Sequence, residues 1–202
     1  AHFYLGVPEQ ISKEAAKSAI IQLNRHKLVL QNFKYDFEIV KYNLDMELNL
    51  YADTMILSWL LNSSEKVGLD YQIDKHFDHK MIAFKEVVKK GENFSNVDVN
   101  DACKYAAEDA LMTLKLYNKQ LEIFEKDDNK ELLDLAFKYE FDFIYVLANM
   151  ENHGIKVDIN LLGQLKEENN KYIQKLTLEI HELAGYEFNI NSPKQLGELL
   201  FE

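Results

Sequence analysis

The segment LVLQNFKYD, residues 28–36, decides the fold class of this chain. It opens with a short apolar run, residues 28–30, that polar residues bound on both sides, a pattern typical of a buried strand. The pattern after it predicts a helix over about residues 34–42. In an α/β layer, ligands bind at the carboxyl ends of the strands. Asn32 stands at such an end and Asp36 stands in the first turn of the helix, so both are candidate ligand-contacting residues.

Helical patterns fill most of the remaining chain. Good N-cap residues precede three of them, at Ser12, Asp98 and Asp158, and Gly154 is expected to end another in the left-handed conformation. Residues 62–97 are irregular by comparison, with short helical pieces. In chain order, the expected longer helices span residues 11–26, 34–42, 55–61, 99–124, 132–152, 159–184 and 193–202.

The best candidate for a domain boundary is the polar break at Asp127-Asp128. It separates two helices with apolar patterns, so we expect one domain over residues 1–128 and the start of another over residues 129–202. Near the end of the chain, residues 192–195 read Ser-Pro-Lys-Gln. This is the pattern of a capping box with proline at the first helical position.

Composition narrows the class of protein. The 202 residues are 47% hydrophobic and 28% charged, the balance of a folded globular protein. No stretch of about 18 apolar residues occurs, so we expect no membrane partner. The single cysteine, Cys103, excludes an intramolecular disulfide and fits a reducing cytoplasm. The net charge of −11 argues against a general nucleic-acid coat, but not against an enzyme that binds a nucleic-acid end through metal ions.

A second pair of candidate residues lies on the long helix expected over residues 99–124. Tyr105 and Asp109 are four residues apart, which is about one helical turn, so their side chains lie on the same face. Of the 11 tyrosines, Tyr105 alone is followed four residues later by Asp. A carboxylate can bind a divalent metal, and a nearby phenol can hydrogen-bond a metal-bound water.

Simpler structural interpretations stand beside these. Asp36 taken alone has the place of an ordinary helix-start acid, and Glu108 with Asp109 could be a solvated pair on an amphipathic helix. His76 and His79 have the spacing of half a metal site. The sequence supplies no obvious further ligands for them, so we interpret them as two partly exposed histidines.

Taken in this order, the motifs resemble those of bacterial DNA polymerase I, the family A DNA polymerases. Residues 31–36 are similar to the second 3′-5′ exonuclease motif of that family, and residues 104–109 to the third, in its Tyr-x-x-x-Asp form. Residues 53–63 resemble the helix that lies between the two motifs. The stretches 152–158 and 184–196 are similar to the start of the polymerase domain. The likeness covers essentially the whole chain.

The resemblance implies a mechanism and a role for each position. In this family two divalent cations, Mg²⁺ or Mn²⁺, hold the terminal phosphodiester of DNA, and a metal-activated water attacks the phosphorus. By resemblance, Asp109 binds the tighter metal, Asp36 acts on the second, and Tyr105 orients the attacking water. By resemblance, Asn32 and Tyr35 contact the 3′-terminal nucleotides, Phe84 meets the single strand, and Lys66 stands near the scissile phosphate. The full set of residues expected to contact DNA is Gln31, Asn32, Tyr35, Lys66 and Phe84.

One family motif is missing from the chain. The first exonuclease motif, Asp-x-Glu on an early strand, supplies two of the four carboxylates, and nothing in residues 1–31 fits it. We expect the motif to lie upstream of Ala1 in a longer protein, so that the chain by itself cannot hold both metals and is inactive or nearly so. The implied fold is helix-rich α/β: a ribonuclease-H-like 3′-5′ exonuclease fold without its first strands, followed by the first helices of a polymerase domain.

The partners that the resemblance implies are a single-stranded or frayed DNA 3′ end and the rest of the polymerase chain, in a bacterial cytoplasm and at the nucleoid. Two alternatives stay open. A stand-alone ribonuclease-D-like exonuclease would share the Tyr-x-x-x-Asp motif but not the stretch 154–196. A degenerate exonuclease-like scaffold would have no catalysis, and the presence of Asp36, Tyr105 and Asp109 argues against it.

Overall fold

The computed structural model of the chain describes residues 11–126 and 129–201. The chain forms two compact units, Ala1–His153 and Gly154–Glu202, which are treated separately below. The domain boundary expected at Asp127-Asp128 lies outside the described residues. The first unit continues past that point, and the division into domains 1–128 and 129–202 stays a prediction.

A strand, a helix and a second strand form the centre of the first unit. Strand β1 (Val29–Leu30) pairs in parallel with β2 (Ala52–Asp53), with Val29 opposite Ala52 and Leu30 opposite Asp53. Helix α2 (Phe33–Leu44) begins just after β1 and connects the two strands. The strand and helix predicted around residues 28–42 are therefore confirmed, as is the helix-rich α/β class.

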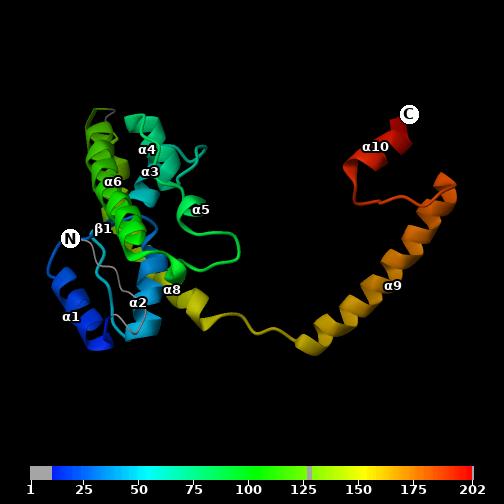
Figure 1. Ribbon diagram of the computed structural model, residues 1–202, viewed down its shortest axis with the longest axis horizontal. Coiled ribbons are helices and arrows are strands. Elements are labelled where there is room, and N and C mark those ends of the chain that lie inside the picture. The colour runs from blue at the N-terminus through cyan, green and yellow to red at the C-terminus, as the bar shows by residue number, and fades with distance from the viewer. Residues whose placement is uncertain (1–10, 127–128, 202) are drawn as a thin grey trace. The chain divides into compact units, whose positions relative to one another are not determined.

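The other helices of the first unit pack around this centre, as Figure 1 shows. Ser12 caps the first of them as predicted, because its hydroxyl accepts a 3.2 Å hydrogen bond from the amide of Ala15. The longest of the described helices, α6 (Val99–Lys126), contacts β1, α3 (Thr54–Leu61) and α4 (Leu69–Phe77). No helix among residues 11–126 and 129–201 is long and apolar enough to cross a membrane. Within the described residues, two further helices precede residue 127: α1 (Lys13–Leu23) and α5 (Phe84–Val87).

The helix expected over residues 132–152 is broken by a wider turn. It consists of α7 (Lys130–Leu135), a π-helical turn (Ala136–Glu140) and α8 (Phe141–His153). Single π-helical turns of this kind occur inside α-helices and are not visible in an apolar repeat. The predicted end is correct, because Gly154 has a φ of +69° directly after α8.

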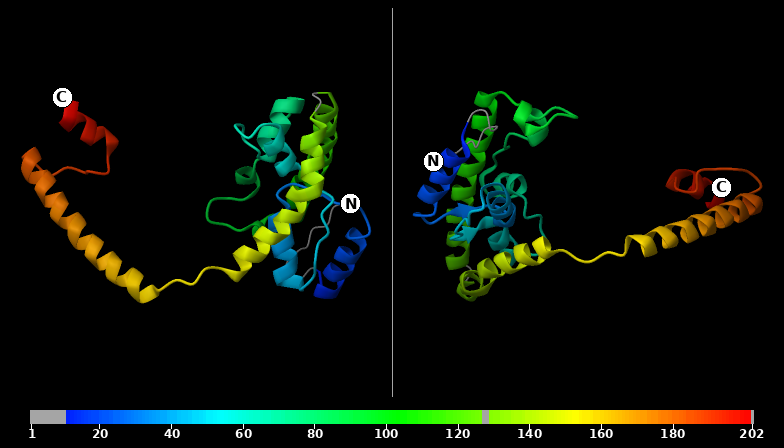
Figure 2. Two further views of the ribbon diagram at one scale, coloured as in Figure 1. Left: turned by 180° about the vertical axis from the view of Figure 1, so that it is seen from behind. Right: turned by 90° about the horizontal axis from the view of Figure 1, so that it is seen from below.

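Helix α8 packs against α2, the helix that follows the first strand (Figure 2). The ring of Tyr145 on α8 meets the rings of Phe33 and Phe37 edge-on, at centroid distances of 5.2 and 5.1 Å. Its hydroxyl donates to the carbonyl of Leu48 at 3.1 Å and accepts from the amide of Leu50 at 2.9 Å. Helix α2 is therefore held on its buried side by an aromatic contact that also carries satisfied polar bonds.

The second unit contains α9 (Ile159–Ala184) and α10 (Pro193–Phe201). Asp158 caps α9 as predicted, through a 3.0 Å bond from the amide of Leu161. The expected capping box at residues 192–195 is half formed. The Ser192 hydroxyl accepts from the amide of Gln195 at 3.4 Å, but the Gln195 side chain accepts from the amide of Asn189 instead of reaching back to the cap.

The buried carboxylate of Asp53 joins the two halves of the strand–helix–strand unit. It accepts hydrogen bonds from the amides of Asn32 at 3.1 Å, Phe33 at 2.8 Å and Met55 at 2.8 Å. One side chain thus satisfies the starts of both α2 and α3. Asn32 itself is left-handed, with φ 60° and ψ 52°, a conformation that asparagine tolerates better than most residues.

We predict that Asp53→Ala lowers the free energy of unfolding by about 2–4 kcal/mol, because three amide donors lose their acceptor in a buried place. Asp53→Asn keeps one oxygen and should cost less. Urea unfolding followed by the fluorescence of the single tryptophan, Trp59 on α3, measures both. The exposed Asp134→Ala is the control. A loss at Asp53 no larger than that of the control would contradict this account.

Candidate active site

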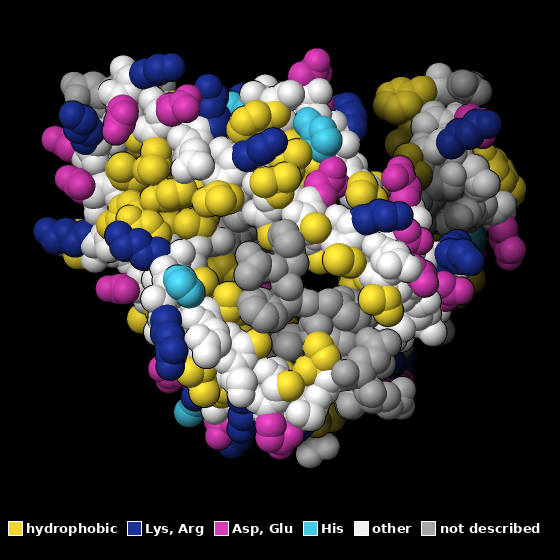
Figure 3. Space-filling model, turned by 60° about the vertical axis from the view of Figure 1, so that its left-hand side comes forward, with side chains coloured by type: hydrophobic (Ala, Val, Ile, Leu, Met, Phe, Trp, Pro, Cys, Tyr) yellow, Lys and Arg dark blue, Asp and Glu magenta, His cyan; other side chains and the backbone are white. Residues whose placement is uncertain are grey.

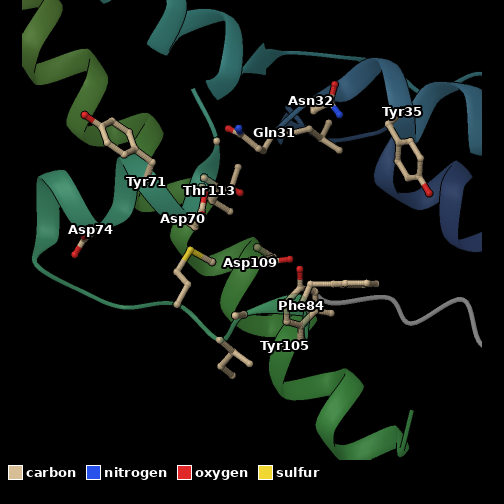
Figure 4. A pocket seen from close by; sticks show the side chains of 18 of the residues that line it. Gln31, Asn32, Tyr35, Asp70, Tyr71, Asp74, Phe84, Tyr105, Asp109 and Thr113 are labelled. Atoms are coloured by element: carbon tan, nitrogen blue, oxygen red, sulfur yellow. The ribbon is translucent and has the colours of Figure 1, made fainter. Parts of the chain in front are cut away.

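One cavity of about 1180 Å³ opens between the end of β1, the start of α2, helix α4, the segment before α5, and α6. Figure 4 shows its labelled side chains, with Gln31, Asn32 and Tyr35 on one side and Tyr105 and Asp109 on the other. All of the site residues expected from the sequence line this cavity: Gln31, Asn32, Tyr35, Asp36, Lys66, Phe84, Tyr105 and Asp109. The structure therefore brings residues as far apart in the chain as Gln31 and Asp109 to the same cavity.

The end of β1 and the first turn of α2 supply one wall. Asn32 and Tyr35 are exposed there, and the carboxyl of Asp36 is half-buried. Gln31, which is expected to contact DNA, has hydrogen-bond partners within the protein. Its nitrogen donates to the carbonyl of Val67 at 3.0 Å, and its oxygen accepts from the hydroxyl of Thr54. The amide of Gln31 thus links the end of β1 to the start of α3 and to the segment before α4.

Helix α6 supplies the opposite wall. Tyr105 and Asp109 are one turn apart, and the phenol hydroxyl donates a hydrogen bond to the carboxyl group of Asp109. Burial and the negative charge of Asp109 raise the pKa of Tyr105 to about 12. The phenol is therefore protonated at neutral pH, and it acts as a hydrogen-bond donor rather than as a base.

Two carboxyl groups that face this cavity hold their protons more tightly than usual. Burial, with the nearby charge of Asp53, raises the pKa of Asp36 to about 6. Burial and the charge of Glu108 raise the pKa of Asp109 to about 6, although the bond from Tyr105 opposes the shift. Acids perturbed in this way within one cavity mark a candidate functional site, because a bound cation would favour their charged form.

The donors of the cavity suit a hard cation, but they are few. Carboxylate, phenol and amide oxygens are the ligands that Mg²⁺ and Mn²⁺ prefer. Within residues 11–126 and 129–201, no group of three His, Cys, Asp or Glu side chains is close enough to hold a metal. Asp36 and Asp109 therefore fit part of a divalent-metal site, and further ligands would have to complete it.

An aromatic wall, defined as Phe84, Phe94 and Tyr105, borders the cavity beside Asp109. The rings of Phe84 and Phe94 are nearly parallel, at 12° and a centroid distance of 6.2 Å. Tyr105 meets them at 6.2 and 6.0 Å. No sequence pattern indicates that Phe94 belongs to this cavity, because it lies in a short 3₁₀ turn, η1 (Phe94–Asn96), inside the irregular segment.

Glu108 is not the solvated acid that the sequence allowed. One of its oxygens accepts from the amide of Ile82 at 2.7 Å, and the other is 2.9 Å from Nε2 of His79. His79 thus contacts a carboxylate. His76 is half-buried elsewhere on α4, and no metal group among the described residues includes the two histidines.

Comparison with known proteins gives this geometry a family context. Residues 5–125 match the family model described as a 3′-5′ exonuclease, which covers more than half of the chain. DNA polymerase I of Borreliella burgdorferi is 37% identical over 177 residues, covering 87% of this chain and 19% of that protein. DNA polymerase I of Pseudomonas aeruginosa is 34% identical over 212 residues, covering 100% of this chain and 23% of that protein. The chain thus spans about a fifth of the length of these relatives.

A solved structure shows the same fold. The POL domain of Pol1 from M. smegmatis, in complex with DNA primer-template and dNTP, matches with a TM-score of 0.67 over 96% of this chain and 31% of that chain. The sequences are 20% identical, so this likeness concerns the fold alone.

We predict that protonation of Asp36 stabilises the first unit. Its pKa is near 3.8 in the unfolded chain and about 6 in the fold, so stability present below pH 4 is lost as pH rises through 6. Asp36→Asn should therefore raise the free energy of unfolding by about 1–2 kcal/mol at pH 8 and change it little at pH 4. Trp59 fluorescence in urea, with EDTA present, measures this. An equal effect at both pH values would show that the cause is not the charge.

Proposed function

The chain belongs to the 3′-5′ exonuclease family, and we propose that its cavity binds the 3′ end of a DNA strand for phosphodiester hydrolysis with divalent cations. The parent protein would be a DNA-directed DNA polymerase I of replication and repair, in which this region removes misincorporated nucleotides. Single-stranded or frayed ends are the proposed substrate, because a paired terminus would have to separate before its last nucleotide could enter a cavity.

The observation that carries the proposal is the meeting of two acids from separate elements. Asp36 comes from the first turn of α2 and Asp109 from the middle of α6, yet both line the same cavity with raised pKa values of about 6. A structural helix-start acid on the surface would show neither property. The exposed Tyr35 and Asn32 stand beside Asp36, where the last nucleotides of a strand would lie.

The chain's own groups would act as binders and orienters. When bound, divalent cations supply charge neutralisation for the scissile phosphate and an activated water. Asp109 and Asp36 would hold them through carboxylate oxygens. The protonated hydroxyl of Tyr105, fixed against Asp109, would orient the attacking water through a hydrogen bond. Lys66 lies on the border of the cavity, where its ammonium group would meet a backbone phosphate, and Phe84 would stack on a base.

We propose further that the chain by itself binds cations weakly and cuts DNA barely or not at all. Residues 1–31 contain no Asp-x-Glu, and the described residues bring no third acidic ligand to Asp36 and Asp109. The missing ligands, and the rest of the polymerase, would be the chain's partners in the full-length protein. Large apolar side chains exposed on α6, such as Leu111 and Leu114, fit such contacts. A patch of hydrophobic side chains is visible on the face of the molecule that Figure 3 draws.

The same shortage of acids favours a second candidate: an exonuclease-like module that serves as a scaffold. Cation binding at Asp36 and Asp109 separates the two, since a scaffold has no need of it. A stand-alone ribonuclease-D-like enzyme is less well supported, because the alignment to the Pseudomonas DNA polymerase I runs through the stretch 154–196 as well. The domains 1–128 and 129–202 and the cytoplasmic, nucleoid-associated setting are part of the same proposal.

We predict that the chain binds Mn²⁺ at millimolar concentrations or tighter and that Asp109→Asn weakens this binding about ten-fold or more, because it removes a charged ligand. Binding should strengthen as pH rises through about 6, where Asp36 and Asp109 lose their protons. Electron paramagnetic resonance of free Mn²⁺ at pH 5, 6 and 7.5 measures this, with the exposed Asp134→Asn as control. Unchanged binding in Asp109→Asn would favour the scaffold.

We predict also that 3′-labelled single-stranded DNA stays intact when it is incubated with this chain and Mg²⁺ or Mn²⁺, because the metal ligands are incomplete. In the full-length parent, Asp109→Ala should abolish 3′-5′ hydrolysis and leave nucleotide addition nearly unchanged. Gel analysis of both reactions provides the measurement. Metal-dependent release of mononucleotides by the 202-residue chain, absent from its Asp109→Ala variant, would refute the claim of incompleteness.

A further inference from the structure

Glu108 is a largely buried acid for which the proposed chemistry has no use. Its side chain is 16% exposed, although it lies between exposed and half-buried neighbours on α6. Burying a carboxylate costs free energy unless hydrogen bonds compensate for the lost water. Here both oxygens have partners, the amide of Ile82 at 2.7 Å and Nε2 of His79 at 2.9 Å. Both partners belong to one segment, residues 78–83.

That segment has no helix or strand of its own. It leaves α4 through Asp78, which is left-handed with a φ of 50°, and it leads directly into Phe84. Besides Glu108, its own ends and two side chains hold it: the amide of Asp78 donates to the carbonyl of Asp74 at 3.0 Å, and the carbonyl of Ala83 accepts from the amide of Glu86 at 2.8 Å. Met81 packs against the small apolar cluster of Ile73, Met112 and Leu116, and Lys80 pairs with Asp74 at the surface. Among the hydrogen bonds between this segment and α6, the bond from the amide of Ile82 to Glu108 is the one nearest to Phe84.

Phe84 follows this segment directly as the first residue of α5, a helix that contacts α6. Its side chain is 55% exposed, so burial does not fix its position. Its ring contacts the other members of the aromatic wall, Phe94 and Tyr105. Tyr105 stands three residues before Glu108 on α6, and Asp109 follows Glu108 directly. A single turn of α6 thus carries Asp109, Tyr105 and Glu108. Glu108 in turn bonds the segment that leads into Phe84.

We infer that Glu108 is a positioning residue that holds the aromatic wall of Phe84, Phe94 and Tyr105 in place as a stacking surface for the terminal, unpaired nucleobase. The inference rests on the proposed function, in which Phe84 stacks on a base, and adds to it the residue that holds the segment leading into that ring. The wall offers ring faces and no base-reading pattern, so it would accept any base. A base held in a duplex has its faces covered by its neighbours and would not reach it.

The test compares two single-stranded oligonucleotides that differ only at the 3′ terminus, which carries a normal nucleotide or an abasic one. Their affinities for the 202-residue chain are measured by fluorescence anisotropy in low salt with EDTA, so that metals play no part. The wild-type chain should bind the normal strand about ten-fold more tightly, the size expected for one base stacked on an aromatic side chain.

Glu108→Ala should remove this preference: the normal strand binds about ten-fold more weakly, and the abasic strand is unaffected. Phe84→Ala should do the same, and the double variant should lose no more than either single variant. Glu108→Gln keeps an acceptor oxygen for the Ile82 amide and should restore most of the preference, which tests the role even if the alanine variant folds poorly. Glu125→Ala, exposed on the same helix and away from the cavity, is the matched control.

Three results would overturn the inference. They are a wild-type chain that does not distinguish the two strands, a Glu108→Ala variant with the full preference, and a variant that weakens both strands equally. Competition by a strand with a 3′-phosphate tests the proposed function separately. If blocking the 3′ end changes nothing, the proposed function fails, whatever the aromatic wall does. If the block matters but Glu108 does not, only this inference fails.

Discussion

The side of the cavity formed by β1 and α2 depends on one buried carboxylate, that of Asp53. By accepting the amides of Asn32, Phe33 and Met55, it fixes the turn out of β1 and the starts of α2 and α3 at once. The left-handed turn at Asn32 places Tyr35 and Asp36 toward the cavity. The same group also shapes the chemistry, because its charge contributes to the raised pKa of Asp36. The Asp53 carboxylate thus both holds the helix starts and contributes to the raised pKa of Asp36, so a substitution at residue 53 would change both.

The opposite side depends on the rigidity of α6. Tyr105, Glu108 and Asp109 lie within about one turn, so their relative positions are set by helix geometry and do not depend on distant contacts. Glu108 then extends that rigidity to a segment without regular structure. The cavity thus joins two rigid elements, a strand end tied by Asp53 and a helix face, through a loop that one side chain holds. Binding sites built in this way keep their geometry without a ligand, at the expense of acids held in an unfavourable environment.

Sequence patterns predicted the parts of this arrangement that are local. The β1–α2 unit, the cap at Ser12, the left-handed Gly154 and the one-turn spacing of Tyr105 and Asp109 each depend on residues within a few positions. Resemblance to a family then predicted which distant residues share a cavity, and the structure places all of them there, although their roles stay predictions. The parts that were missed are long-range. Gln31 bonds to Val67, and Glu108 bonds to Ile82, across separations at which no periodic pattern carries information. Phe94 and the π-helical turn at 136–140 were missed for the same reason: packing, not propensity, decides them.

The acidity of the chain bears on how it could bind DNA at all. With a net charge of −11, long-range attraction to a phosphate backbone is absent, so affinity would have to come from short-range contacts at a strand end. The cavity has groups suited to contacts of that kind: the rings of the aromatic wall, the ammonium group of Lys66 at its border, and the carboxyl groups of Asp36 and Asp109. Repulsion between the acidic chain and the DNA phosphates would then discriminate between parts of a DNA molecule. A duplex interior brings many phosphates and no accessible base face, whereas a frayed 3′ end brings few phosphates and an open base. Under the proposed function, an acidic chain with such a cavity would therefore favour ends over lengths of DNA without any base-specific contact.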